Sequence, residues 1–519
     1  TFMSAAPWHE IEITLVATQR HADAYTHVAC HADFVSDTGL AIRRPAFWDG
    51  ERTWRVRFAS PLPNTRWQWT SDANVNDAGL RRSGTIKVGE AITTGTRFQR
   101  HGFLRMSPGR RNLMHADGKP MLLAADTAWA LPFRATPEQC EVYAQRRRAQ
   151  GFNGVLLMSL QPDMKPIGTG NRGADGDFDV VFDDLREGTL TCLCPSYFQR
   201  MDQLISVLLD HGLMPIYQPV FHGYGWMGGQ VAGPGLSSDD YARYCRYLVA
   251  RYGARPAMWL LGGDGHNRYE SINVAGHAVE SCDAYQHPTG LHYGPQGENN
   301  IWQDQQWLDF QWCQTGHNAE HLQERVADMW RNLPVKAIAN GETTYENIGA
   351  MGKAAGWWQG HEAWSNLCAG GTMGVVYGAG SLWQWRLHAN EPQHADWAHA
   401  PGLSWRDALD FEGANYIGVI AKLFDDLPFT DMRPNWTYTY GRRALCVPDE
   451  LFIVYLPTGG YVKFVDPRVP RHYRVVDPRT GNMLHSGELE NKERELRLPE
   501  PSPVVVICTR SPIKPPPVS

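Results

Sequence analysis

The first part of the chain alternates apolar and polar residues one by one. Runs such as IEITLVA and TWRVRFAS show this alternation, and turn sequences such as WDGE and PLPN separate them. A period of two is typical of strands that bury one face. The pattern therefore predicts an N-terminal β-sandwich of the immunoglobulin-like type over residues 1–97.

After residue 98, apolar runs alternate with longer amphipathic stretches. We expect strands at 120–126, 153–160, 213–220, 257–264, 289–294, 307–314, 335–342 and 372–378. We expect helices at 136–152, 195–212, 237–253, 318–333, 349–367 and 405–424. The pattern predicts the α/β class, with a (β/α)8 TIM barrel over 98–427. An open doubly wound sheet is the alternative, but no strand leads into a GxGxxG or P-loop sequence.

The last part of the chain returns to short apolar runs with turn sequences between them. ELFIVYLP and SPVVVICT are the most apolar of these runs, and DPRTG is a turn sequence of the kind that joins hairpin strands. We therefore predict a small C-terminal β-sandwich over 428–519.

Charge and composition exclude several classes of partner. The chain of 519 residues has a net charge of −6 and contains no basic run. We therefore expect neither nucleic acid nor a membrane as a partner. No segment approaches about 18 consecutive apolar residues, the length that spans a bilayer. The sequence gives no indication of oligomeric state.

The start of the chain and its thiols bear on the compartment. The first residues lack a basic segment followed by an apolar one, so a signal peptide is either absent or already removed. Ten cysteines are scattered without zinc-ribbon spacing, and we interpret them as buried free thiols. Both features slightly favour a cytoplasmic location, and secretion after signal removal is the alternative.

Tryptophan is abundant, with 20 residues in the chain. Many lie beside glycine and polar residues in predicted loops, at 222–229, 356–364 and 381–388. An indole is a flat apolar surface with one polar edge, which suits the face of a sugar ring. We expect about half of them to be core residues instead, so these loops are candidates for a saccharide site.

Three acids stand at the ends of predicted strands. Asp126 ends the first, Asp264 ends the fourth after WLLGG, and Glu342 ends the seventh after VKAIANG. Barrel enzymes carry their catalytic groups at these carboxyl ends. Strands four and seven lie on nearly opposite sides of the barrel mouth, so their acids can face each other across a substrate. Two carboxyl groups on either side of one bond are what glycoside hydrolysis requires.

Glycines precede both of these acids. We expect Gly262, Gly263 and Gly341 to let the backbone and a sugar approach each other closely. Acids at strand ends also cap helices, and that structural role, or binding of a sugar hydroxyl, is the expectation for Asp126.

Other hydrolytic chemistries have less support. The chain has no GxSxG sequence and no HExxH sequence. Four histidines, His222, His266, His292 and His317, lie near strand ends and could gather at one metal ion. Hydrogen bonding to sugar hydroxyls is the simpler use for them, so we predict neither a metal nor another cofactor.

The central region resembles the apiosidase-like glycoside hydrolases, glycoside hydrolase family 140 and its relatives. The segments that carry the resemblance run in family order from residue 101 to 390. They are LLAADTAWAL, RRRAQGFNGVLL, CPSYFQRMDQLISVLLDHGLMPIYQPVF, YLVARYGARPAMWLLGGD, QTGH, NGETTYEN and WSNLCAGGTMGVVYGAGSLWQW. The N-terminal FWDGERTWRVRFASPLPNTRWQW and the C-terminal DPRTG segment are similar to the β-domains that flank such barrels.

The resemblance implies a retaining mechanism. Asp264 corresponds to the acid/base and Glu342 to the nucleophile, with Glu346 as a rival in the same motif. A retaining pair lies about 5–5.5 Å apart, whereas about 9 Å indicates inversion. Two positions depart from the family pattern, because Ala125 replaces the usual Gly and Thr343 replaces a common Pro. Both could reshape the sugar subsite, so apiose itself is not assumed.

The sequence therefore predicts an exo-acting retaining glycosidase for a pentofuranoside, resembling apiose or arabinofuranose, or for a related sugar. The expected substrate-binding residues are polar or aromatic groups near strand ends: Asp126, His222, His266, His292, Gln314, His317, Tyr345, and Trp383 or Trp385 beneath the sugar. We expect Trp129 to belong at least as readily to the core. Two alternatives remain, a catalytically inactive carbohydrate-binding protein and a metal-dependent hydrolase that uses the histidines.

Overall fold

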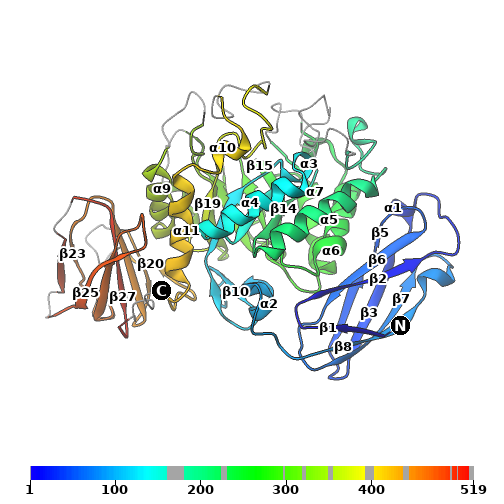
Figure 1. Ribbon diagram of the computed structural model, residues 1–519, viewed down its shortest axis with the longest axis horizontal. Helices are drawn as coiled ribbons and strands as arrows, with labels where there is room; N and C mark the ends of the chain where they lie inside the picture. Colours follow the sequence, from blue (N-terminus) through cyan, green and yellow to red (C-terminus); the bar gives the residue numbers. More distant parts are fainter. Residues whose placement is uncertain are drawn as a thin grey trace.

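The protein consists of a central barrel between two β-domains (Figure 1). The computed structural model describes residues 2–160, 180–223, 231–295, 298–317, 323–348, 355–391, 402–436, 443–490, 494–498 and 501–512. In Figure 1 the N-terminal domain lies to the right of the barrel and the C-terminal domain to the left.

The N-terminal domain is built from two sheets that share one core. The larger sheet has the order β1-β8-β7-β3-β4 and the smaller has the order β2-β6-β5. The strands are β1 (Phe2–Ala5), β2 (Glu10–Val16), β3 (Cys30–Ser36), β4 (Ala41–Pro45), β5 (Phe47–Trp48), β6 (Thr53–Ala59), β7 (Arg66–Ala73) and β8 (Ser83–Val88). Phe34 and Phe58 stack between the sheets at 4.1 Å. In β7 the residues are buried and exposed in strict alternation, as the sequence pattern predicts.

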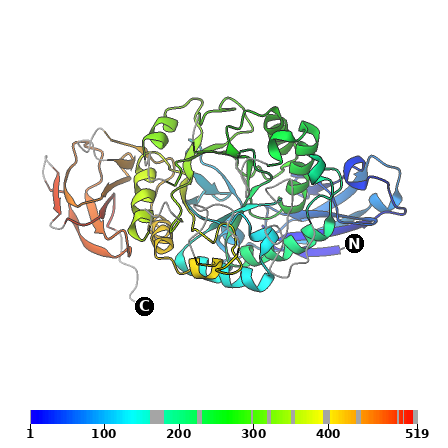
Figure 2. The same cartoon turned by 90° about the horizontal axis from the view of Figure 1, so that it is seen from above.

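The central sheet has eight parallel strands, which confirms the predicted barrel (Figure 2). Its strands are β12 (Leu123–Thr127), β13 (Gly154–Met158), β14 (Met214–Gln218), β15 (Met258–Gly265), β16 (Thr289–Tyr293), β17 (Phe310–Gln314), β18 (Ala337–Glu342) and β19 (Gly374–Tyr377). Neighbours pair in chain order, and β19 returns to β12. Between β18 and β19 the barrel is joined by a hydrogen bond from the Met373 amide to the Ile338 carbonyl.

Helices surround the barrel. They include α4 (Pro137–Gln150), α5 (Pro195–Asp210), α6 (Ser238–Tyr252), α7 (Glu270–Cys282), α8 (Glu324–Trp330), α9 (Trp357–Cys368), α10 (Trp405–Ala408) and α11 (Gly413–Phe424). The predicted start of α4 is confirmed, since the Thr136 hydroxyl and the Gln139 side chain form a reciprocal cap. Two details differ from the sequence pattern. The segment expected as one helix at 405–424 is two, and α7 lies in a segment for which no helix was predicted.

A small sheet closes the barrel from below, at the end where the strands begin. It consists of β9 (Leu104–Met106), β10 (Leu113–His115) and β11 (Pro120–Met121), in antiparallel pairs. Figure 1 shows β10 beneath the barrel, with the short helix α2 (Arg97–His101) beside it. The carboxyl ends of the strands lie at the opposite end, where the predicted acids are.

The C-terminal domain packs one sheet between its own core and the barrel. Its sheets have the orders β20-β21-β22-β27-β24-β25 and β23-β26. The strands are β20 (Arg433–Pro434), β21 (Ala444–Val447), β22 (Leu451–Leu456), β23 (Gly460–Lys463), β24 (His472–Val476), β25 (Met483–Glu488), β26 (Glu495–Leu498) and β27 (Val504–Thr509). Every residue of β22 is buried, because one face joins the barrel core and the other joins the domain core.

Two further findings concern composition. All ten cysteines are free, and seven are buried. Among the described residues, no helix is both long enough and apolar enough to cross a membrane.

Candidate active site

Asp264 and Glu342 both follow an irregularity in their strand. The register of β15 against β16 shifts after Leu260 and again after Gly262, and β18 shifts against β17 beside Gly341. A bulge inserts an unpaired residue and turns the following side chains. Asp264 also has a left-handed backbone, with φ of 55°. The two acids are therefore aimed by local backbone geometry as well as by strand ends.

The glycines before the acids make room for protein groups rather than for a sugar, which corrects our expectation. A Cβ on Gly263 would lie 2.1 Å from the Gln218 amide, and one on Gly262 would lie 2.6 Å from the Asn267 side chain. At Gly341 the added carbon would meet the Trp312 ring at 2.8 Å. Each glycine thus allows a neighbouring side chain to pack directly against the strand.

Two histidines hold the carboxylate of Glu342. His317 Nε2 lies 3.2 Å from one oxygen, and His292 Nε2 lies 3.3 Å from the other. The Tyr345 amide donates to His317 Nδ1, which leaves Nε2 as the nitrogen that carries hydrogen. Burial would raise the pKa of Glu342, but its interactions with His292 and His317 outweigh burial and hold the pKa well below its usual range. Glu342 is therefore a buried but ionised carboxylate.

Aromatic rings support this cluster. The Tyr345 ring lies 4.4 Å from the His317 ring, and Trp129 Nε1 donates to the Tyr345 hydroxyl at 3.3 Å. Trp129 also lies beside His292, at 5.7 Å between ring centres. Trp383 is 6.2 Å from Tyr345 and 7% exposed. Trp129 is buried, as we expected for a core residue, and it also contacts Tyr345 and His292 of the cluster.

The Tyr345 hydroxyl links the two acids electrostatically. Burial raises its pKa well above 10, and the charges of Glu342 and Asp264 raise it further. Both carboxylates therefore lie close enough to act on the same hydroxyl, which stays protonated. Asp264 itself is half-buried, in contrast to Glu342 with 7% of its surface exposed.

The four histidines divide into two pairs. His292 and His317 lie at Glu342. His222 and His266 both stack on the Tyr269 ring, at 5.6 and 4.8 Å between ring centres. His266 is exposed, while His222 is buried and has no hydrogen-bond partner on either ring nitrogen within the described residues. Burial lowers the pKa of His222 to about 3, so the ring is neutral. Among the residues that the structure describes, no group of three or more His, Cys, Asp or Glu residues could hold a metal ion.

Asp126 lies outside this cluster, which corrects its expected contact with substrate. Its carboxylate is fully buried and accepts hydrogen bonds from Arg147 at 2.6 Å and Tyr143 at 2.8 Å, both on α4. The alternation of β12 explains this direction, since Leu123 and Ala125 face Gly154 of the next strand and Asp126 faces the helices. The acid fixes α4 to the barrel and leaves no oxygen for a sugar.

Two other candidates also prove to be structural. Trp385 is fully buried and stacks on Trp405 at 4.4 Å, with its Nε1 donating to Gln139 of α4. It therefore packs between α4 and α10 and cannot lie beneath a sugar. Glu346 accepts from the Tyr377 hydroxyl at 2.6 Å and from the amides of Gly356 and Gly413. Its carboxylate ties the loop after β18 to α11.

Gln218 is a candidate site residue that the sequence analysis missed. It ends β14, its side chain is fully buried, and neither amide atom has a partner within the described residues. Gln314 at the end of β17 likewise has an unpaired side-chain oxygen. Buried polar groups without partners are costly, so their gathering at one end of the barrel marks a place for ligand hydroxyls. The sequence did carry a signal for Gln218, because this polar residue directly follows the apolar run LMPIY near the end of a predicted strand.

The two departures from the family pattern also have structural roles. Ala125 is fully buried in β12. The Thr343 hydroxyl donates to the Val376 carbonyl at 3.1 Å and so connects the end of β18 to β19. Proline at 343 has no hydroxyl and could not make that bond.

Comparison with known families decides the assignment. The model of the apiosidase-like catalytic domain matches residues 107–431, more than half of the chain. The chain belongs to the apiosidase-like family. As a member of it, the protein is a glycoside hydrolase, and its substrate is a carbohydrate. Residues 4–74 match a domain of unknown function, DUF5060.

Solved structures share the fold of this apiosidase-like protein. A Bacteroides vulgatus ATCC 8482 protein assigned to the glycoside hydrolases is 18% identical, with a TM-score of 0.75, and the match covers 98% of this chain and all of the other. A glycoside hydrolase family 5 protein from the same organism is 19% identical, with a TM-score of 0.66, over 81% of this chain and 95% of the other. No curated protein matches the chain.

Proposed function

We propose that this apiosidase-like protein is an exo-acting retaining glycosidase in which Glu342 is the nucleophile and Asp264 the acid/base. The observation that carries the proposal is the state of Glu342. It is buried and ionised at the end of β18, with His317 Nε2 3.2 Å from one carboxylate oxygen and His292 Nε2 3.3 Å from the other. Its negative charge remains available to a developing oxocarbenium ion.

Asp264 suits the second role because it lies at the end of β15 and is half-buried, and its charge acts on the same tyrosine as that of Glu342. In the first step Asp264 protonates the leaving oxygen while Glu342 attacks the anomeric carbon. In the second step Asp264 removes a proton from water, and the water oxygen displaces Glu342. The Tyr345 hydroxyl donates a hydrogen bond to Glu342 and positions its carboxylate.

The unpaired polar groups supply the sugar subsite. Gln218, His222 and Gln314 each carry buried polar atoms without partners among the described residues, and sugar hydroxyls would satisfy them. Trp383, 6.2 Å from Tyr345 and 7% exposed, offers an apolar surface beside the cluster. Family membership favours a pentofuranoside such as apiose or arabinofuranose, and the exposed His266 lies where an aglycone would leave.

The test is proton NMR of the released sugar, with aryl apiosides, aryl arabinofuranosides and pectic side-chain oligosaccharides as substrates. We expect the first anomer released to retain the configuration of the substrate. We expect Glu342→Gln to lower kcat by about 10³-fold or more, and Asp264→Asn by about 10²–10⁴-fold, less for good leaving groups. Azide should restore turnover to a small-residue Glu342 variant and give an inverted glycosyl azide.

Glu346→Gln is the matched control, because it changes a buried glutamate four residues away whose carboxylate holds α11. Its kcat should stay within about tenfold of wild type if the protein folds. An inverted first product would refute the assigned roles, and equal loss in Glu346→Gln would refute the choice of nucleophile. Loss of activity on chelation would instead favour metal-dependent hydrolysis.

A further inference from the structure

A second pocket lies at the opposite end of the barrel from Glu342. Its volume is about 730 Å³, within the range of small-ligand sites. Asp309 lines it and directly precedes β17, whereas Gln314 ends that strand beside Glu342. Five residues of strand separate the two ends by about 16 Å. The pocket is therefore separate from the candidate active site.

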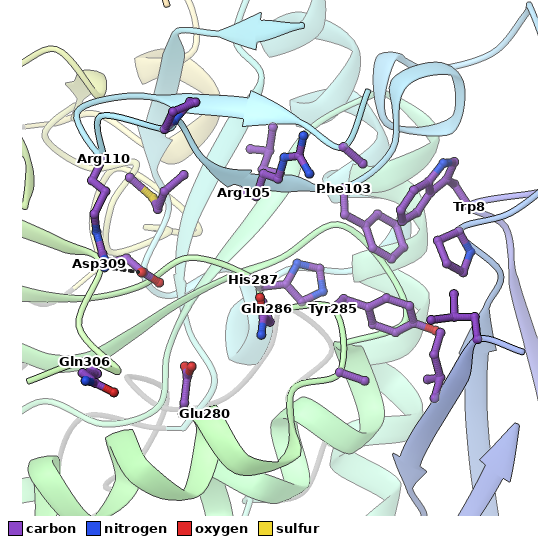
Figure 3. A pocket seen from close by; sticks show the side chains of 18 of the residues that line it. Trp8, Phe103, Arg105, Arg110, Glu280, Tyr285, Gln286, His287, Gln306 and Asp309 are labelled. Carbon is purple, nitrogen blue, oxygen red and sulfur yellow. Dashed lines mark hydrogen bonds and ion pairs between the residues drawn. The ribbon is translucent and has the colours of Figure 1, made fainter. Parts of the chain in front are cut away.

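Four parts of the chain form its walls, and three of them bring the aromatic side chains, while Gln306 and Asp309 come from the connection between β16 and β17 (Figure 3). Trp8 comes from the N-terminal domain, Phe103 from the segment that enters β9, and Tyr285 from the connection between α7 and β16. The pocket exists only where the N-terminal domain meets the underside of the barrel. The Tyr285 hydroxyl fixes that junction, since it donates to the Ala59 carbonyl and accepts from the Ala59 amide, both at 2.8 Å.

The aromatic side chains gather at one end of the pocket in Figure 3. Phe103 lies 4.9 Å from Trp8 and 5.3 Å from Tyr285, both edge to face. Trp8 has a left-handed backbone, with φ of 61°, and a Cβ on Gly102 would lie 2.7 Å from its ring. A non-glycine residue in that conformation is strained, which makes the position of Trp8 a feature to explain. The half-buried indole is thereby held rigidly at the pocket wall.

His287 supplies a buried polar atom that needs a partner. Its Nε2 donates to the Gly253 carbonyl at 2.8 Å, while its Nδ1 has no hydrogen-bond partner within the described residues. The residue is 2% exposed and lines the pocket beside Phe103, at 5.3 Å between ring centres. With Nε2 carrying the hydrogen, Nδ1 is an acceptor that a ligand hydroxyl would satisfy.

Charged side chains of both signs line the rest of the pocket. Arg105 and Arg110 are cationic, and Asp309 and Glu280 are acidic. Arg110 lies 3.4 Å from Asp309, whose other oxygen accepts from the Thr289 amide. A lining that mixes cations with acids does not by itself select an anion or a cation. Donors and acceptors beside an aromatic wall instead suit a neutral molecule with many hydroxyl groups.

We propose that this pocket is a second, non-catalytic binding site that takes a neutral sugar unit of a glycan. The sugar ring lies against Trp8, one hydroxyl donates to His287 Nδ1, and Arg105 and Arg110 donate to other ring or hydroxyl oxygens. No bond is made or broken there. The site holds the protein on a saccharide chain at the end of the barrel away from Glu342.

The test is calorimetric titration of the full chain carrying Glu342→Gln, which prevents turnover during the measurement. The probes are cellotetraose, xylotetraose and arabinotetraose as neutral chains, and tetragalacturonate as an anionic one. We expect at least one neutral probe to bind, and Trp8→Ala to remove one binding site or weaken binding by about tenfold or more. Arg105→Ala, at an exposed position, should weaken the same binding without endangering the fold.

Trp48→Ala is the matched control, because Trp48 is a half-buried tryptophan of the same domain that does not line the pocket. It should bind the probe as the parent does. The proposal is overturned if no neutral probe binds, if tetragalacturonate binds more tightly, or if Trp8→Ala and Arg105→Ala both bind like the parent. Because Trp8 and Arg105 line a pocket at the other end of the barrel from Glu342, the comparison of these variants does not depend on the proposed catalytic roles.

Discussion

At the scale of single residues, the buried carboxylates of Glu342 and Asp126 differ in what holds them. Asp126 lies 2.6 Å from the guanidinium of Arg147, with neither side chain exposed, so its charge is cancelled inside the protein. Glu342 accepts a hydrogen bond from His317, lies 3.3 Å from His292 Nε2, and keeps its charge. Of the two, only Glu342 can stabilise positive charge on a substrate. Both acids end predicted strands, and their partners alone tell them apart.

Asp126→Asn tests the structural role of this pair. We expect it to destabilise the protein by about 3–5 kcal/mol, because Arg147 would remain buried without a compensating charge. Chemical denaturation measures the loss, and KM measured at low temperature should stay within about twofold of wild type. A large rise in KM with unchanged stability would show instead that Asp126 contacts the substrate.

Asp309 predicts a pH dependence of stability. Burial is the main cause that raises its pKa to about 7, and the charge of Glu280 also raises the pKa. The hydrogen bond from the Thr289 amide and the charges of Arg110 and Lys336 lower the pKa but do not outweigh burial. Its unfolded value is near 4, so the folded chain binds more protons between those values and stability falls as pH rises from about 4 to about 7. Asp309→Asn should remove this decline. Unfolding free energies at pH 4 and pH 8 check it: the variant should gain stability relative to wild type at pH 8 and not at pH 4.

At the scale of elements, both catalytic candidates depend on strands that bulge. The patterns WLLGGD and VKAIANGE predicted the two strands and their acids, and the structure confirms those strands. The sequence could not predict the bulges, because they depend on register against β16 and β17. Nor could it indicate what the glycines accommodate, since Gln218 and Trp312 come from neighbouring strands.

Gly263→Ala tests this arrangement. Its new methyl group would displace the Gln218 amide and move the segment that carries Asp264, so we expect a stability loss of about 1–3 kcal/mol and a larger fractional loss of kcat/KM. Gly235→Ala is the control, because an added Cβ there meets nothing within 4 Å. Measurements of kcat/KM and chemical denaturation curves of both variants check this prediction. Full activity in Gly263→Ala would mean that Gln218 and Asp264 need no fixed relation.

At the scale of the whole molecule, the three domains are joined by buried polar and aromatic contacts. Arg57 of the N-terminal domain and Arg251 of α6 both contact Asp202 of α5, each at 2.7 Å. On the other side, Tyr455 of β22 stacks on Trp364 of α9 and hydrogen bonds to His361 at 2.9 Å. Residues of both flanking domains also join the hydrophobic core of the barrel.

Tyr455→Ala should accordingly weaken more than its own domain. Removing a buried aromatic side chain costs about 3–5 kcal/mol. Because the ring packs on α9, we expect the thermal transition of the barrel to fall together with that of the C-terminal domain. Calorimetry would detect the shift, and Tyr461→Ala, at an exposed position of β23, is the control. A barrel transition that stays in place would mean that the domains unfold independently.

The sequence by itself determined the order of the elements and the chemistry at their ends. Periods of two and of about 3.6 residues reflect which faces are buried, and that local information predicted the eight barrel strands, the two flanking β-domains and the acids Asp264 and Glu342. The tertiary structure decided which groups meet. Asp126 and Trp385 hydrogen bond to residues of α4, and His292 and His317 lie at Glu342. The Gln218 side chain, at the barrel mouth, has no partner among the described residues. These contacts join residues far apart in the chain, and the burial and hydrogen bonding that set their chemistry arise only when the barrel closes.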